Sequence, residues 1–122
     1  GLTMADEYVP LRNPGKAITA QASAAVTAGQ LVEITGDNTV GPAGAGSAKW
    51  RGVAAFNAAT GQLVTVLSGG DHELIASGAI AVGAEGSAAA GGAVATAGAD
   101  TNVVGVAFRA SSGGRVHVAL AR

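Results

Sequence analysis

One short pattern, a glycine followed by alternating apolar residues, recurs along this chain and limits what it can fold into. It occurs at residues 29–34, 61–66, 78–82, 92–96 and 114–118. Glycine reaches the positive φ that tight turns require, and alternating β-branched residues favour a strand with one buried face. The pattern therefore predicts an all-β chain of short strands joined by glycine turns.

Small side chains dominate the composition. Glycine fills 20 of the 122 positions, aromatic residues make up 3% and charged residues 12%. Each small side chain removes little apolar area from water, at about 25 cal/mol per Å². Glycine also raises the conformational entropy that folding must overcome. We expect such a chain to gain stability by associating with copies of itself or with a larger surface.

Charge and residue usage narrow the classes of partner. A formal net charge of −1 without a basic stripe argues against nucleic-acid binding. The chain has no cysteine, so disulfides and thiolate metal sites are excluded. Its apolar stretches are interrupted well before the roughly 18 residues of a membrane span, and no secretory signal is expected at its start. The sequence thus predicts no nucleic-acid or membrane partner.

The alternating segments predict where the strands lie. We expect residues 36–39 and 68–71 to form turns and residues 41–47 a flexible loop of small residues. In residues 83–99 alanine favours a helix, but the interspersed glycines oppose it, so short strands and a turn are predicted there. Besides those in the glycine pattern, the predicted strands include residues 17–22, 31–35, 52–56 (a buried strand that ends at Phe56), 63–67 and 72–76.

The start of the chain has a different character. Residues 1–3 precede Met4 like a cloning remnant, and Pro10 and Pro14 hold their neighbours extended. We expect residues 1–16 to form this remnant and an extended arm, and residues 17–122 a single β domain. A loose terminus without a role is about equally compatible with the sequence, but its apolar residues favour docking on a partner. The residues expected to dock are Tyr8, Val9, Pro10, Leu11, Arg12 and Asn13.

Two segments of the chain resemble each other. Residues 52–56, followed by Gly61 and residues 64–66, are echoed by residues 105–108, followed by Gly113 and residues 116–118. Two copies are too few for a solenoid. The echo predicts a pair of similar hairpins within one barrel or sandwich.

Residues suited to catalysis are scarce. Of the two histidines, His117 lies between two valines on a predicted strand and should face solvent or a neighbouring subunit. Asp71, His72 and Glu73 are adjacent on a strand, so their side chains alternate in direction and cannot converge on one ion. No serine lies in a nucleophile elbow, and residues 41–47 lack the ending of a phosphate loop. The sequence predicts no enzyme, no metal and no cofactor.

The single tryptophan, Trp50, has two possible roles. Between Lys49 and Arg51 it could anchor an interface at the surface. A lone tryptophan ahead of a buried strand more often fills a core. The core position is the prediction.

The order of these segments resembles the family of small tailed-phage capsid decoration proteins, also called capsid cement proteins. The resemblance runs from Val9 to Leu120. It rests on the order of short Gly/Ala/Val-rich segments, since no single segment is specific, and residues 84–99 depart from it. The matching segments are residues 9–16, 27–32, 52–54, 72–83, 104–107 and 116–120.

The resemblance implies a β-tulip or barrel-like fold like that of the lambda head decoration protein. It further implies a homotrimer on the outer surface of the virion capsid, with the major capsid protein as partner. Such a trimer would stabilise the head against the pressure of packaged DNA, by binding linkage. Two alternatives stay open: another virion β module, of the tail or baseplate, and a carbohydrate-binding domain. Carbohydrate binding normally uses exposed aromatic side chains, and the low aromatic content of 3% argues against it here.

Overall fold

The described part of the chain folds into ten short strands and one 3-10 turn, which confirms the predicted all-β class. The structure, a computed structural model, describes residues 16–98 and 102–121. In chain order the elements are β1 (Lys16–Ala22), β2 (Leu31–Gly36), β3 (Thr39–Pro42), β4 (Trp50–Ala54), β5 (Leu63–Ser68), β6 (Asp71–Ile75), β7 (Glu85–Ala89), η1 (Ala90–Gly92), β8 (Ala93–Thr96), β9 (Val103–Ala107) and β10 (Arg115–Leu120).

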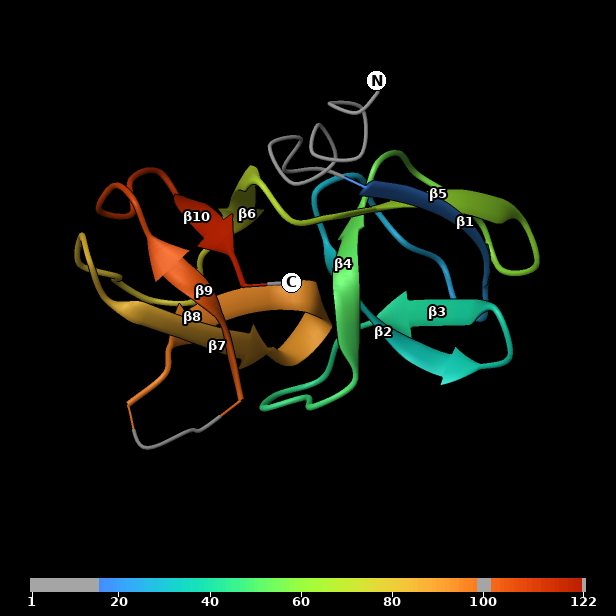
Figure 1. Ribbon diagram of the computed structural model, residues 1–122, viewed down its shortest axis with the longest axis horizontal. Helices are drawn as coiled ribbons and strands as arrows, with labels where there is room; N and C mark the ends of the chain where they lie inside the picture. Colours follow the sequence, from blue (N-terminus) through green and yellow to red (C-terminus); the bar gives the residue numbers. More distant parts are fainter. Residues whose placement is uncertain (1–15, 99–101, 122) are drawn as a thin grey trace, which may run out of the picture.

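The strands form two sheets that follow one another along the chain (Figure 1). Strands β1–β5, here called the first unit, form a closed barrel in the order β1-β3-β2-β4-β5. The barrel closes where β1 and β3 run parallel, at Gln21↔Thr39 and Ala22↔Val40. Strands β6–β10, the second unit, form a sheet in the order β6-β10-β9-β7-β8. Its two outer strands approach each other at the single parallel bridge Ala76↔Val94.

The second unit repeats the first strand by strand. The β4–β5 pairs Val53↔Leu67 and Ala54↔Val66 recur in β9–β10 as Val106↔Ala119 and Ala107↔Val118. All the other pairings recur in the same way, β6 taking the place of β1, β7 of β2 and β8 of β3. Even the register shift between β2 and β4 recurs between β7 and β9. The two hairpins that echo each other in the sequence therefore belong to two complete five-stranded copies.

One glycine holds the same position in both copies. A Cβ at Gly52 would overlap the backbone carbonyl of Leu67, and a Cβ at Gly105 would overlap that of Ala119. Neither glycine has a positive φ, so close strand approach, and not turn geometry, requires them.

Two apolar clusters fill the molecule. The first lies inside the barrel, among residues such as Val32, Val64 and Val66. The second fills the second unit, but four of its members come from the first unit: Leu31, Ala43, Trp50 and Val53. Trp50 is almost fully buried there, which confirms its predicted core position. Because the second cluster takes residues from both units, it also holds the units against each other.

Two predicted segments, a loop and a strand, were wrong at their edges. Residues 41–47 are not wholly a loop, because β3 extends through Pro42 and both Gly41 and Ala43 are buried. The strand from Gly52 ends at Ala54, and Phe56 is 47% exposed beyond it.

Residues 78–82, the third occurrence of the glycine pattern, form no strand. Ile80 is nevertheless buried, and its backbone exchanges hydrogen bonds with Ser111, so the apolar period marks burial without a sheet partner. The low-complexity stretch does form short strands and a turn, β7, η1 and β8. Alanine does not make it helical because Gly91 and Gly92 take positive φ there. Within the described residues no helix is long and apolar enough to cross a membrane.

Candidate functional site

The predicted docking residues Tyr8, Val9, Pro10, Leu11, Arg12 and Asn13 lie outside the residues that the structure describes. Their role stays a prediction, as does the division of the chain at residues 16 and 17. The described chain begins at Lys16 in β1, on the side of the molecule where β1, β5, β6 and β10 lie, uppermost in Figure 1. We call this side the β1/β6 side.

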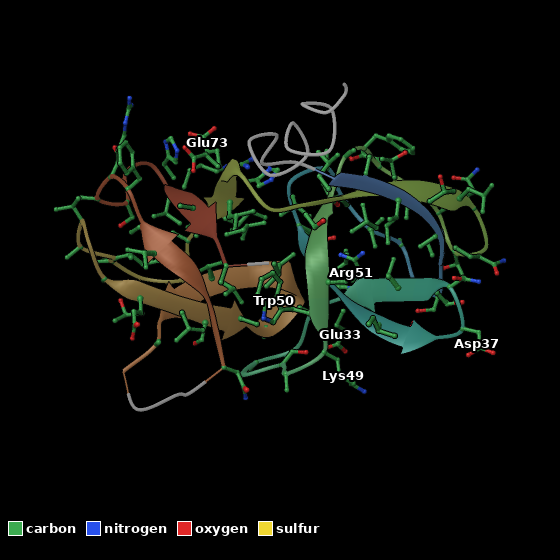
Figure 2. The ribbon with its side chains drawn as sticks, viewed as in Figure 1. Glu33, Asp37, Lys49, Trp50, Arg51 and Glu73 are labelled. Carbon is green, nitrogen blue, oxygen red and sulfur yellow. The ribbon has the colours of Figure 1, made fainter. Side chains whose placement is uncertain are left out.

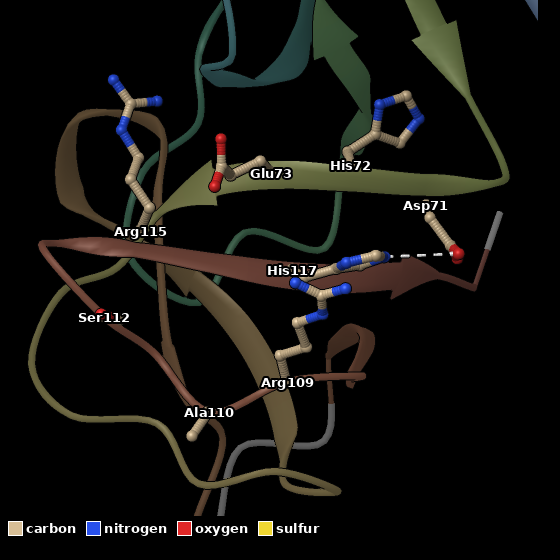
Figure 3. A pocket seen from close by; sticks show the side chains of 8 residues that line it. All are labelled: Asp71, His72, Glu73, Arg109, Ala110, Ser112, Arg115 and His117. Carbon is tan, nitrogen blue, oxygen red and sulfur yellow. Dashed lines mark ion pairs between the residues drawn. The ribbon is translucent and has the colours of Figure 1, made fainter.

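On the second unit the β1/β6 side carries an open hollow of about 350 Å³, drawn in Figure 3. Both histidines of the chain lie here, together with carboxylates and guanidinium groups. The outward positions of β6 and β10 supply several of these groups, since neighbouring residues of a strand face opposite ways. The hollow is lined by Asp71, His72, Glu73, Arg109, Ala110, Ser112, Arg115 and His117.

The polar groups of this hollow are held by local contacts. His117 Nε2 lies 3.3 Å from Asp71 Oδ2, and the His117 ring contacts that of Phe108 at 5.4 Å between centroids. His72 Nε2 lies 2.8 Å from the carbonyl oxygen of Gly69. His117 is half-buried between the buried Val116 and Val118, and its side chain turns to the hollow as the alternation predicts.

The hollow does not resemble a metal centre. Within residues 16–98 and 102–121 no three His, Asp or Glu side chains gather in a way that could hold an ion. Figure 3 shows Asp71 and His72 directed to different sides of β6, as expected for neighbours on a strand. What the hollow offers is a surface with charges of both signs.

The first unit presents an uncharged surface at the equivalent positions. By strand register Thr19 and Thr65 stand where the second unit has Glu73 and His117, and Leu63 stands in place of Arg115. Leu63 is 66% exposed. Phe56, in the loop that follows β4, is 47% exposed and takes the position that Arg109 holds in the second unit, two residues after the equivalent Ala54 and Ala107. The two units therefore offer one charged and one apolar area to a partner on the β1/β6 side.

A second hollow, of about 140 Å³, opens between β1 and β3 of the first unit. Ile34 lies in it and is 45% exposed, and Arg51 borders it. Figure 2 shows Trp50 and Arg51 on opposite sides of β4, with Trp50 toward the second unit and Arg51 toward β3. We call this hollow the barrel groove.

Near the edge of the barrel one carboxylate is held ionised. A hydrogen bond from the Ser47 side chain lowers the pKa of Glu33 below its ordinary value of 4.5, and the Gly44 N–H and Lys49 act in the same direction. Burial opposes them. The Gly44 N–H donates to Glu33 Oε1 at 3.2 Å. Glu33 therefore fastens the connection between β3 and β4 and is not available as a proton donor at neutral pH.

Comparison with known proteins identifies the class. Residues 12–122 match the phage cement protein family. A search of curated proteins finds no match. Among solved structures the chain is similar to the crystal structure of the head fiber gp8.5 N base in bacteriophage phi29, with a TM-score of 0.71 and 22% identity over 88% of this chain and 94% of that chain.

Because the match covers most of its length, the chain belongs to the phage cement protein family. It is a structural protein of the phage capsid surface and not an enzyme. The family resemblance predicted the first, and the scarcity of catalytic residues predicted the second. The likeness to the fiber base shows the shared fold.

Sequence reasoning missed the two hollows. Their residues are scattered over several strands, and only the pairing of the strands assembles them. The spacing between equivalent glycines, Gly29 and Gly83 or Gly52 and Gly105, was a signal that could have revealed the whole repeat.

Proposed function

We propose that this cement protein binds the outer surface of the phage capsid as a homotrimer and stabilises the head against the pressure of packaged DNA. The observation that carries the proposal is the family match over residues 12–122. The major capsid protein is the proposed partner. Ligand linkage supplies the mechanism: a protein that binds joined capsid subunits better than separated ones shifts the equilibrium toward the joined state.

The β1/β6 side is the proposed capsid-binding surface. It carries the charged hollow of the second unit and the exposed Leu63 and Phe56 of the first. The described chain also begins on this side, at Lys16, so the predicted docking arm is attached there. The arm, the apolar area and the charged area would then contact the capsid together, and several weak contacts would add up to firm binding.

The composition supports the trimer. The largest fully buried side chains of the described residues are one tryptophan, two leucines and seven valines, so each copy has a modest core. Association removes further apolar surface from water and makes stability depend on protein concentration. Light scattering on the purified protein and on protein released from heads measures the copy number. A stable monomer in both would rule out the trimer.

Co-sedimentation with undecorated heads tests the capsid function. We expect saturable binding, and decorated heads should retain their DNA at temperatures where undecorated heads release it. Binding to tails or baseplates with no binding to heads would favour the alternative virion role. Binding to immobilised glycans alone would favour the carbohydrate-binding role.

The arm is tested by deletion of residues 4–14. The deleted protein should keep its fold, measured by circular dichroism, and its affinity for heads should fall severely, because the apolar contacts of Tyr8, Val9 and Leu11 are lost. Unchanged affinity would show that the arm is a terminus without a role and would place the contact on the described surface.

A further inference from the structure

The two units of one chain already form an interface whose two sides differ. The outer face of β2 and β4 on the first unit supplies Leu31, Trp50 and Val53. These side chains pack against the second unit. There they join Leu74, Ala88, Val94 and Val104 in one buried cluster.

Backbone groups complete this interface. The Gly92 N–H donates to the Ala43 carbonyl at 3.0 Å, and the Gly46 N–H donates to the Ala88 carbonyl at 2.8 Å. The Gln30 amide reaches the Gly91 carbonyl at 2.9 Å. The outer face of the first unit thus lies in a groove of the second unit, lined by Leu74, Ala88, Val94 and Val104 and called here the filled groove.

Each unit carries both surfaces, but only one of each is used within the chain. The unused outer face lies on β7 and β9 of the second unit, where Glu85, Val103 and Val106 stand in the positions of Leu31, Trp50 and Val53. Glu85 is exposed and Val106 is 42% exposed. We call these three residues the outer face of the second unit.

The unused groove is the barrel groove of the first unit. Its Ala20, Ile34, Val40 and Arg51 occupy the positions that Leu74, Ala88, Val94 and Val104 hold in the filled groove. All four positions are buried in the second unit, in one cluster with residues of the first unit. In the first unit Ala20 and Val40 are buried inside the barrel itself, so the barrel groove offers the side chains of Ile34, 45% exposed, and of the half-buried Arg51 to a partner. Figure 1 places β3 and the β7–β9 pair at opposite ends of the molecule.

The two unused surfaces match each other in chemistry. Superposing the interface within the chain on a contact between chains places Val106 where Val53 lies and Ile34 where Ala88 lies, within the same apolar cluster. It also places Glu85 where Leu31 lies in the interface within the chain, and Arg51 where Val104 lies, so Glu85 enters a groove that Arg51 borders. Opposite charges then lie in one groove where the buried interface has two apolar residues. Such a pair gives an interface direction and register.

We propose that a second copy of this chain seats the outer face of its second unit in the barrel groove of the first unit, head to tail. The inference rests on the self-association in the proposed function and names its surfaces. A head-to-tail contact uses two different surfaces, so it closes into a ring when its rotation permits. In a ring of three every groove is filled and no outer face is left free.

Cysteine cross-linking tests the pairing, because the chain has no cysteine of its own. The double variant Ile34→Cys/Val106→Cys should form disulfides between chains on mild oxidation, ending at three linked chains on non-reducing gels. Neither single variant should cross-link, because in a head-to-tail contact a residue does not meet its own copy. Leu63→Cys/Val82→Cys is the control, because its two positions, 66% and 65% exposed, are even more open to chance collisions than Ile34 and Val106.

The gel outcomes separate the inference from the function on which it rests. Dimers from a single variant would show a two-fold contact and overturn the pairing, as would a double variant no more linked than the control. A ladder beyond three chains supports the two surfaces and overturns the trimer. If the double variant does not cross-link and the unmodified protein does not bind heads, both proposals are overturned. If the double variant does not cross-link but the unmodified protein binds heads, only the inference is overturned.

Charge exchange tests the Arg51–Glu85 contact. Arg51→Glu and Glu85→Arg should each raise the concentration at the midpoint of assembly at least about tenfold, because like charges then meet in the groove. The double variant should return the midpoint to within about threefold of the original. Glu73→Arg, an exposed reversal on the β1/β6 side, should leave the midpoint unchanged. A double variant as weak as either single one would overturn the contact.

Discussion

The first and second units have the same strands, pairings and register, yet they differ in closure. The first unit closes into a barrel through two parallel pairs, Gln21↔Thr39 and Ala22↔Val40. The second is held at the single bridge Ala76↔Val94, and residues of the first unit, Trp50 among them, complete its core. The same pattern of strand pairing therefore gives a barrel with a core of its own in the first unit, and in the second unit a core that residues of the first unit complete.

The two units also differ in the side chains that they present on the β1/β6 side. The first unit offers apolar and neutral residues on the β1/β6 side, and the second offers both histidines and charges of both signs. Outward positions of a sheet contribute little to folding, so they can change while the ladder is kept. A repeated structural unit can thus make two chemically different contacts with one partner.

The largest expected effect comes from the glycine that the two units share. Gly52→Ala and Gly105→Ala should each abolish the folded state at 25 °C, because the added methyl group overlaps a backbone carbonyl of the paired strand. Circular dichroism and urea unfolding measure this. Gly44→Ala, where a Cβ meets nothing within 4 Å, is the control and should stay folded. If only one of the two variants unfolds, the units are less equivalent than their register shows.

Trp50 and its equivalent Val103 should differ strongly. Trp50→Ala is expected to lower the free energy of unfolding by about 3–5 kcal/mol, because it empties the core that both units share. Val103→Ala should cost less than about 1.5 kcal/mol, because Val103 is only half-buried. Urea unfolding at a protein concentration well below the midpoint of assembly measures both, because the proposed contact between copies covers Val103 above it. Equal losses at that low concentration would mean that the outer face of the second unit is as buried within one chain as that of the first.

The two areas of the β1/β6 side should bind heads in different ways. Arg109→Ala/Arg115→Ala should weaken head binding about tenfold at low salt and reduce its salt dependence, because charge contacts are screened by ions. Phe56→Ser/Leu63→Ser should weaken binding while the salt dependence stays, since apolar burial is lost. Co-sedimentation over a range of salt concentrations measures both. Two variants that bind like the unmodified protein would place the contact on the arm.

The smallest expected effect concerns Glu33, whose equivalent in the second unit is the uncharged Ser87. Folding lowers the pKa of Glu33, so its stabilisation is present above pH 4.5, the ordinary value, and is lost as the pH falls through the lowered pKa. Glu33→Gln should therefore lower stability slightly at pH 7 and flatten the loss between pH 4.5 and the lowered pKa. Ser87→Ala should leave the pH profile unchanged. Thermal unfolding across this range measures the difference, and parallel profiles for Glu33→Gln and the original would contradict it.

Much of the fold was readable from the residues. Four of the five segments with the glycine pattern lead into or form a strand. Alternating apolar residues give a strand one buried face, and the glycine forms the turn before it. The strand predicted at residues 78–82 was wrong, because the burial of Ile80 gives the same apolar period without a sheet partner. Phe56 was misplaced because a large apolar residue after a strand resembles its continuation, although here it is exposed.

The sequence by itself determined the all-β class, the glycine turns, the buried position of Trp50 and the family resemblance, since each depends on residues close together in the chain. Only the tertiary structure extended the echoed hairpins to two complete copies and revealed the core that the units share, the charged hollow and the barrel groove. These depend on register between distant strands, and the two copies keep their register through backbone hydrogen bonds, which leave little trace in the side chains. Glu33 and Ser87 share one position in the ladder and nothing in their chemistry.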